Sequence, residues 1–322
     1  MGATTEISWT DATFNPWWGC LKVSPGCTNC YALTLSKRFG HDIWGPSKTT
    51  SRRTFGPKHW AEPLKWNKEA EQAGQRKRVF CASMADVFED HPQLPPERAK
   101  LWTLIEQTSW LDWLLLTKRP ENIDQMLPDR WRRADKGFPH NVWLGFSAED
   151  QQRFDERWQI MEWVKRMWYP RVVFCSAEPL LGPLDISDAL TEIDLGDDEH
   201  QVWSATLDWV IAGGESGRGA RPACPDWFRG LRDQCQAAGI SYHFKQWGEY
   251  EPYEEDAQPP FWNDQHGRMY DGHGLNIIDP ESGEMGRGWH EESLCSPYAF
   301  RRVGKHAAGR LLDGREWNEM PT

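Results

Sequence analysis

The stretch that decides the fold is "DWLLLT" at residues 112–117, in which four apolar side chains follow one another without interruption. Unbroken apolarity over so short a run predicts a strand that is buried on both faces, as in parallel sheets. Similar runs recur along the chain at intervals of 30 to 36 residues, which is typical of βα units. They are "VFCASM" (79–84), "VWLGFS" (142–147), "VVFCSA" (172–177), "DWVIAG" (208–213) and "YHFK" (242–245).

Helical patterns fill the intervals between these runs, at residues 95–109, 148–167 and 225–239. The first begins with proline and places four apolar residues along one face. These are Ala99, Leu101, Trp102 and Ile105. With "TFNPWWG" (13–19) as a first strand, seven strands alternate with helices, which predicts an α/β fold with right-handed crossovers. We therefore expect a (β/α) barrel, partial or complete, of the TIM-barrel-like kind.

The barrel pattern covers residues 1–248 and is interrupted once. Residues 41–78 break the alternation, and their content of Ser, Thr, Arg and Pro predicts a loop or lid with one short helix. After residue 248 the apolar runs stop, and Gly, Asp and Glu become frequent. We expect residues 249–322 to form a C-terminal extension packed on the barrel.

Composition limits the classes of function. The 322 residues carry a formal charge of −11, which argues against strong non-specific binding to DNA. A local basic path remains open, with Arg52, Arg53 and residues 130–136 as candidates. No run of 18 apolar residues and no signal-peptide pattern is present, so we expect a cytoplasmic protein without membrane partners. Most of the 21 tryptophans are expected in the core.

Three of the eight cysteines gather in "WWGCLKVSPGCTNCYA" (17–32), namely Cys20, Cys27 and Cys30. Clustered thiols in a chain of this size indicate metal binding more often than disulfides. A structural zinc would want a second Cys-x2-Cys pair, which the chain lacks, so an iron–sulfur cluster with one iron left open fits better. Zinc, and packing or a disulfide without metal, remain alternatives. The other five are expected to be buried: Cys81, Cys175, Cys224, Cys235 and Cys295.

Polar residues follow the apolar runs, and the carboxyl ends of parallel strands meet at one edge, where ligands bind. Lys118, Glu178 and Lys245 are candidate catalytic residues, because helix capping does not require them. The glycine pair at 213–214 could bring backbone N–H groups close to an anion. The candidate cofactor-binding residues are Ser83, Asp86, Ser147, Glu149, Gly213, Gly214 and Glu215.

These motifs carry a resemblance. Three cysteines after the first strand of an α/β barrel resemble the radical S-adenosylmethionine (radical SAM) superfamily. More closely, a family first catalogued in phage genomes as proteins of unknown function is similar over nearly the whole chain. The matching motifs are "GCLKVSPGCTNCYA", "FCASMADVFED", "LLLTKRPENI", "VWLGFSAED", "FCSAEPLLGPL", "WVIAGGESGRGARP", "FKQWGE" and "AGRLLDGREWNEMP".

The superfamily resemblance implies a [4Fe–4S] cluster on Cys20, Cys27 and Cys30, with S-adenosylmethionine chelating the open iron. Reduction by an external electron donor would cleave the cofactor to methionine and a 5′-deoxyadenosyl radical, which abstracts hydrogen from a substrate. The phage association suggests a nucleobase or nucleic acid as that substrate.

The sequence departs from the superfamily in three ways. The spacing is Cys-x6-Cys-x2-Cys instead of Cys-x3-Cys-x2-Cys, and Asn29 stands where an aromatic residue is common. The "GGES" motif follows the sixth strand and not the second. Ser83 and Asp86 are therefore the candidates for binding the amino group of the cofactor.

Three hypotheses follow for function. The first is a radical SAM enzyme that modifies or repairs a nucleobase or nucleic acid. The second is a binding or regulatory barrel braced by an iron–sulfur cluster or zinc. The third is a hydrolase or nuclease that holds divalent metals with strand-end carboxylates. These carboxylates are Asp86, Glu149, Glu178 and Glu215.

Overall fold

The computed structural model describes residue 5 and residues 7–132, 137–190, 206–253 and 298–321. It also gives the backbone of five short strands between these ranges. They are β8 (Ile193–Asp194), β9 (Val202–Trp203), β13 (Trp262–Asn263), β14 (Met269–Tyr270) and β15 (Asn276–Ile278). No helix in the described part of the chain has the length and apolarity needed to cross a membrane.

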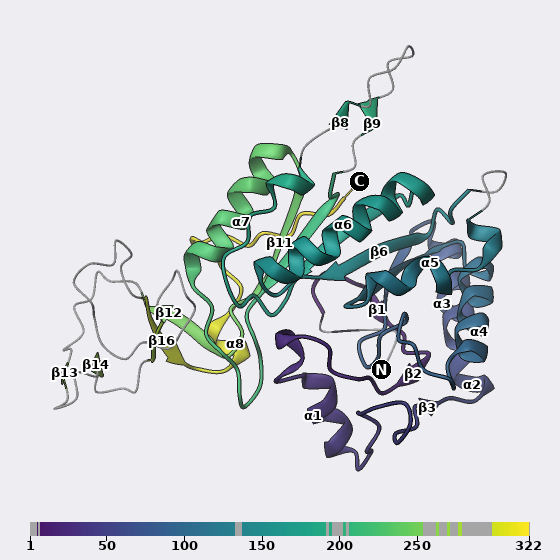
Figure 1. The fold of residues 1–322 in the computed structure, drawn as a ribbon, viewed down its shortest axis with the longest axis horizontal. Coiled ribbons are helices and arrows are strands. Elements are labelled where there is room, and N and C mark those ends of the chain that lie inside the picture. Colours follow the sequence, from purple (N-terminus) through teal and green to yellow (C-terminus); the bar gives the residue numbers. More distant parts are fainter. Residues whose placement is uncertain are drawn as a thin grey trace.

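The centre of the molecule is a seven-stranded parallel sheet that curls into a half-barrel (Figure 1). Its order is β1-β4-β5-β6-β7-β10-β11, so each strand lies beside its neighbour in the chain, as in a barrel wall. β1 and β11 are the two edges of the sheet, whereas a complete barrel would pair them. The strands are β1 (Ala12–Thr13), β4 (Lys77–Cys81), β5 (Leu111–Thr117), β6 (Val142–Ser147), β7 (Val172–Ala177), β10 (Trp209–Gly213) and β11 (Ser241–Gln246).

The first strand differs from the prediction. β1 covers only Ala12–Thr13, and Trp17–Trp18 forms a separate strand, β2, which pairs antiparallel with β3 (Arg53–Thr54). Pro16 lies between the two pieces. Because proline has no N–H to donate to a ladder, it separates the sheet strand from β2.

Both faces of the sheet are buried, as the unbroken apolar runs predict. Val79, Leu115 and Leu144 point to the main core under the helices. Their neighbours alternate to the inner side of the curl, where a second cluster forms. Its buried members are Trp9, Phe80, Leu114, Trp143, Val172, Phe174, Trp209 and Ile211. Among the described residues twelve tryptophans are buried, which confirms that most of the 21 serve the core.

The three expected helices form as α4 (Pro95–Gln107), α6 (Gln151–Trp168) and α7 (Pro225–Ala238). In α4, Leu101, Trp102 and Ile105 are buried as predicted, but Ala99 is exposed and Leu104 is buried in addition. The short helix α5 (Ile123–Met126) follows β5.

The segment at residues 41–78 is only partly the expected loop. After β3 it forms two helices, α2 (Pro57–Trp60) and α3 (Glu62–Ala73). α3 buries Trp66 and Ala70 in the main core. It is therefore the crossover helix between β1 and β4, and the loop character is confined to the first part of the segment.

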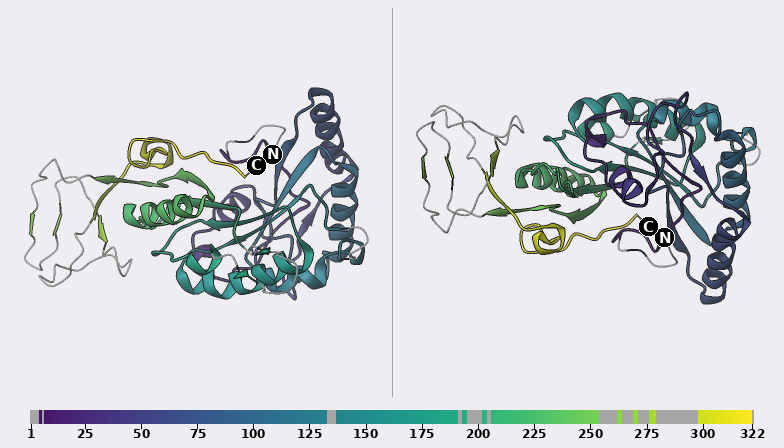
Figure 2. Two further views of the ribbon diagram at one scale, coloured as in Figure 1. Left: turned by 90° about the horizontal axis from the view of Figure 1, so that it is seen from above. Right: turned by 90° about the horizontal axis from the view of Figure 1, so that it is seen from below.

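The last residues of the chain return to the sheet. β16 (Tyr298–Arg302) pairs with β12 (Tyr250–Tyr253), and the short helix α8 (Lys305–Ala308) follows (Figure 2). The chain then runs antiparallel along β11, where the Phe244 N–H donates to the Trp317 carbonyl over 3.0 Å. The division at residue 248 stays a prediction, and most of residues 254–297 lies outside the described part.

Gly145 on β6 tests the packing inside the curl. A Cβ at this position would lie 2.2 Å from the Phe174 ring, so Gly145→Ala must displace an aromatic ring in the inner cluster. We expect urea unfolding to show a loss of about 2 kcal/mol or more, as overpacked cores do.

Gly230→Ala is the matched control for this change. Gly230 lies on α7 with open space around its Cα, so alanine should stabilise the helix by about 1 kcal/mol. Equal effects of the two substitutions would contradict the packing described for the inner cluster.

Candidate functional site

The segment with the three cysteines, residues 20–30, lies across the carboxyl ends of the sheet strands; we call it the cysteine loop. It leaves β2, forms a short 3-10 turn at Pro25–Cys27, and ends at Cys30, which is the N-cap of α1 (Tyr31–Arg38). All three thiols are free and half-buried. The loop is held by groups from successive strand ends.

β4 and β5 hold the two ends of the cysteine loop. Tyr31 donates from its hydroxyl to the Ser83 carbonyl over 2.8 Å. Arg119, which follows β5, donates to the Leu21 carbonyl over 2.6 Å and to the Cys20 Sγ over 3.6 and 3.7 Å. Cys20 therefore has a guanidinium as its direct neighbour.

β6 and β10 hold the middle of the loop. The Gly26 N–H donates to the Glu149 carboxylate over 3.1 Å. The Asn29 amide donates to the Glu215 carboxylate over 3.0 Å. Arg221 forms a two-point ion pair with the same Glu215 and also donates to a carbonyl in the loop. Carboxylates predicted to bind a cofactor thus bind the loop that carries the thiols.

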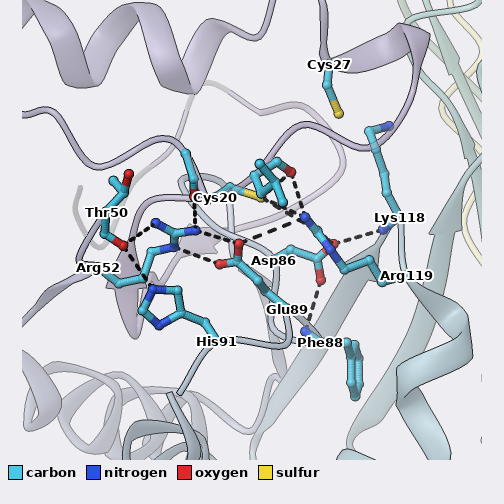
Figure 3. Close-up of polar contacts among 12 residues, drawn as sticks. Cys20, Cys27, Thr50, Arg52, Asp86, Phe88, Glu89, His91, Lys118 and Arg119 are labelled. Atoms are coloured by element: carbon cyan, nitrogen blue, oxygen red, sulfur yellow. Dashed lines mark hydrogen bonds and ion pairs between the residues drawn. The ribbon is translucent and has the colours of Figure 1, made fainter. Parts of the chain in front are cut away.

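Asp86 fixes Arg119 in place (Figure 3). One carboxylate oxygen accepts from the Phe88 N–H and the Thr117 hydroxyl, and the other accepts from the Lys118 N–H and the Arg119 guanidinium. A carboxylate offers about four lone-pair sites. These four donors occupy them, which leaves Asp86 little capacity for the amino group of a cofactor.

A second buried pair lies beside this one. Arg52 forms a two-point ion pair with Glu89, and Arg119 approaches the same carboxylate to 4.0 Å (Figure 3). Arg52 also donates to the Gly45 carbonyl over 2.9 Å. Arg52 is therefore an internal brace, although the sequence suggested it as part of an exposed basic path.

The rest of that suggested path is also paired. Arg130 pairs with Glu106, and Arg132 pairs with Asp129. Residues 133–136 lie outside the described part of the chain. Arg130 and Arg53 are both exposed, and Arg53 contacts His41 instead of a carboxylate.

Glu149 is fully buried and charged. Burial alone would raise the pKa of its carboxyl, but the positive charges of Lys118 and Arg157, with hydrogen bonds from Ser24 and the Gly26 amide, lower it to about 2. Arg157 lies 2.9 Å from the carboxylate and Lys118 lies 3.6 Å from it.

Arg157 also holds the backbone at Ser147. It donates to the carbonyl of Ser147, at the end of β6, over 2.7 Å. The predicted site residues Ser147 and Glu149 are thus both tied to α6 through one guanidinium. The sequence signal for Arg157 was a charge on the apolar face of α6, where it lies between Phe154, Trp158 and Met161.

The thiols sit in a cationic setting. Burial raises the pKa of Cys20 to about 12, although Arg119 opposes the shift. Burial also raises the pKa of Cys30, and hydrogen bonds from the Leu33 and Ala32 amides, and less strongly the charge of Lys118, oppose this shift. Figure 3 shows the Lys118 amino group on the side of Cys27. Its Nζ is buried and makes no hydrogen bond within the described residues.

Four of the other five cysteines are buried as predicted. Cys81, Cys175, Cys224 and Cys235 are buried in the core, and Cys295 lies outside the described residues. Among the described side chains, no three of the metal-ligating type lie close enough together to hold one metal ion.

The other predicted residues form a second group at β7, β10 and β11. Lys245 donates to the Glu178 carboxylate, and Gly213 lies against the same carboxylate. The Gly214 N–H already donates to the Gln246 carbonyl over 2.9 Å. A Cβ on Gly214 would lie 1.9 Å from the Trp247 carbonyl, so glycine is needed there for close packing.

A hollow of about 480 Å³ opens beside the cysteine loop, which is within the size range of small-molecule sites. Lys118 and Arg157 line it together with residues of both charges from α6 and the end of β5. The lining residues are Val23, Lys118, Glu121, Gln152, Arg153, Glu156, Arg157 and Ile160.

Comparison with known proteins gives one match. A family model described as a protein of unknown function (DUF5131) matches residues 4–321. No curated protein and no solved structure matches the chain.

Glu149→Gln tests the electrostatics of the site. Because the pKa is about 2 in the folded chain and ordinarily 4.5, the substitution should lower the free energy of unfolding by about 3 kcal/mol at pH 7. A depressed pKa stabilises the fold above pH 4.5 and loses this contribution as the pH falls toward 2. Urea unfolding measures the difference in unfolding free energy between the unaltered chain and Glu149→Gln. This difference should be less than half as large at pH 3 as at pH 7.

The control is Glu156→Gln, also on α6. Glu156 is exposed and pairs with Arg153, so its removal should cost about 0.5 kcal/mol or less at either pH. If the loss of unfolding free energy in Glu149→Gln does not change with pH, the charge of Glu149 is not what stabilises the loop.

Proposed function

The chain belongs to the DUF5131 family of proteins of unknown function, and from the site at its strand ends we propose that it is an iron–sulfur enzyme of the radical SAM kind. Its proposed substrate is a nucleobase or nucleic acid. The observation that carries the proposal is the cysteine loop: three free thiols on one segment, held at the ligand-binding edge of a parallel α/β sheet and faced by Lys118 and Arg119.

The donor set suits a cluster better than a single ion. Thiolates are the ligands of iron–sulfur clusters, and a cubane offers a separate iron to each of them. A single zinc would need its ligands around one point, and the described side chains provide no such group of three. Cys20, Cys27 and Cys30 would hold the cluster.

The surrounding charges suit an anionic group. Arg119 already donates to the Cys20 sulfur, and the charge of Lys118 acts on Cys30. Hydrogen bonds and cations around cluster sulfurs stabilise the cluster and set its potential. Burial raises the pKa values of Cys20 and Cys30, so these thiols need such partners to be deprotonated.

When bound, the cluster and S-adenosylmethionine would supply hydrogen abstraction by a 5′-deoxyadenosyl radical, with the electron drawn from an external donor. Lys118 is the residue we assign to the carboxylate of that cofactor, because its buried Nζ has an ion pair but no hydrogen-bond acceptor in the described chain. The hollow lined by Lys118 contains side chains of both charges. This suits a ligand that carries an ammonium and a carboxylate group, as the methionine part of the cofactor does.

We assign a proton-transfer role near the substrate to Glu178 and Lys245. Lys245 donates a hydrogen bond to a Glu178 oxygen, and both side chains are about four-fifths buried. General acid–base catalysis needs an acid or base within hydrogen-bond reach of the proton that it transfers.

The hydrolase hypothesis is weaker on this geometry. Each of its four carboxylates has a cationic partner already: Asp86 with Arg119, Glu149 with Arg157, Glu178 with Lys245 and Glu215 with Arg221. A divalent metal site needs uncompensated carboxylates that converge, and the described residues do not provide them.

The first test is metal content. After anaerobic purification we expect about four irons and four sulfides per chain, lost on Cys20→Ala, Cys27→Ala or Cys30→Ala. Cys235→Ala, a buried cysteine on α7, is the control and should retain the iron. One zinc per chain in place of iron, or iron that survives all three substitutions, would overturn the proposal.

The second test separates Lys118 from the cluster. Lys118→Met should retain iron but weaken binding of S-adenosylmethionine about tenfold or more, as loss of a charged hydrogen bond does. Equilibrium dialysis measures this, with Lys68→Met on the exposed face of α3 as the control. Unchanged affinity in Lys118→Met would remove this residue from the cofactor site.

A further inference from the structure

The charge of the chain is unevenly distributed. Residues 12–61 contain seven Lys and Arg but one acidic residue, Asp42, which is a formal charge of +6. The rest of the chain then carries −17, since the total is −11. The same segment contains the cysteine loop, α1 and β3. A basic surface on an acidic protein indicates a partner with negative charge.

The cations of this segment are exposed and available. Lys37, Arg38, Lys48 and Lys58 are exposed, and none forms an ion pair with another described residue. Arg52 is the buried exception. Elsewhere most exposed cations have a carboxylate partner within 4 Å. Examples are Arg76 with Asp112, Arg130 with Glu106 and Arg301 with Glu251.

Aromatic rings lie among these cations. Phe39, just after α1, is 56% exposed and stacks on Trp18 with its ring centroid 6.0 Å away. The Arg53 guanidinium lies over the rings of Trp18 at 5.0 Å and Phe55 at 5.3 Å. His41 contacts both Trp18 and Arg53. These contacts join the end of α1 to β3 as one surface.

We propose that the basic face formed by Lys37, Arg38, Phe39, His41 and Arg53 binds single-stranded nucleic acid. Cations that follow a phosphate backbone, combined with exposed rings on which bases stack, are the means by which proteins bind single strands. This inference rests on the proposed function, since it names the substrate class of the same site.

The position of the basic face fits this role. It lies at the C-terminal end of α1, while Cys30 caps the other end, and eight helical residues span about 12 Å. In Figure 1, α1 and β3 lie together at the bottom of the molecule, apart from α6 and α7. A strand bound there would reach the cysteine loop.

Two other polyanions fit less well. A duplex hides the faces of its bases, so the Phe39 ring would have nothing to stack on. An anionic membrane surface would want a continuous apolar helix face. The exposed residues of α1 include Thr34, Lys37 and Arg38, so its outer face is polar.

The test is fluorescence anisotropy with the full chain and a labelled 20-nucleotide single strand of mixed sequence, between 50 and 200 mM salt. The double variant Lys37→Glu/Arg38→Glu should bind at least tenfold more weakly. The slope of the log binding constant against the log salt concentration should become shallower by about 0.7 for each lost phosphate contact. The control Lys68→Glu/Arg171→Glu reverses two exposed cations outside the basic face and should change neither quantity.

Stacking is tested separately. Phe39→Ala should lower the affinity about fivefold or more and leave the salt slope unchanged, because it removes a stacking ring without removing a charge. Trp163→Ala on α6 is the control, since Trp163 is also an exposed ring, at 42%. Its affinity should equal that of the unaltered chain.

The inference is overturned if the chain does not bind the single strand at 50 mM salt, or if the controls weaken binding as much. Equal binding of the duplex, or tighter binding to phosphatidylserine vesicles than to the oligonucleotide, would overturn it too. Iron is counted in the same preparations. Iron present without strand binding would refute this inference alone, whereas strand binding without iron would refute only the proposed enzyme.

Discussion

The Asp86 carboxylate is the constraint on which the site depends. It accepts four hydrogen bonds at the end of β4, and through them it fixes the backbone after β5 and the guanidinium of Arg119. Arg119 in turn contacts Cys20 and the Leu21 carbonyl. The carboxyl ends of β4 and β5 thereby determine where the cysteine loop begins. A buried charged network of this kind is costly unless every member is satisfied, which favours one arrangement of the loop.

The sequence predicted the sheet well because its signal is local. Most of the six runs, "DWLLLT" among them, are continuously apolar, and each of the six overlaps a strand of the sheet. Residues 41–78 were expected to hold one short helix, but they hold α2 and the twelve-residue α3, of which only a few residues, such as Trp66 and Ala70, are buried. β1 was placed too far along the chain, since the apolar pattern continues past Pro16 although the ladder cannot.

The site residues were predicted from topology, but the direction of their side chains was not. Glu149 meets Gly26, which lies 123 residues earlier, and a single sequence does not show such a pairing. A carboxylate at a strand end looks the same whether it faces a ligand or a loop. Arg157 was missed for a related reason: a charge on the apolar face of α6 has meaning only once its buried partner is known.

The segment from Trp317 to Glu319 has a consequence for how the sheet folds. It covers the edge of β11, where the Phe244 N–H donates to the Trp317 carbonyl and the Tyr242 N–H donates to the Glu319 carboxylate. Until this segment docks, β11 presents unpaired N–H and C=O groups, which can pair with other chains. A folding intermediate that lacks this contact is therefore prone to aggregate through β11, and docking of the segment ends that exposure.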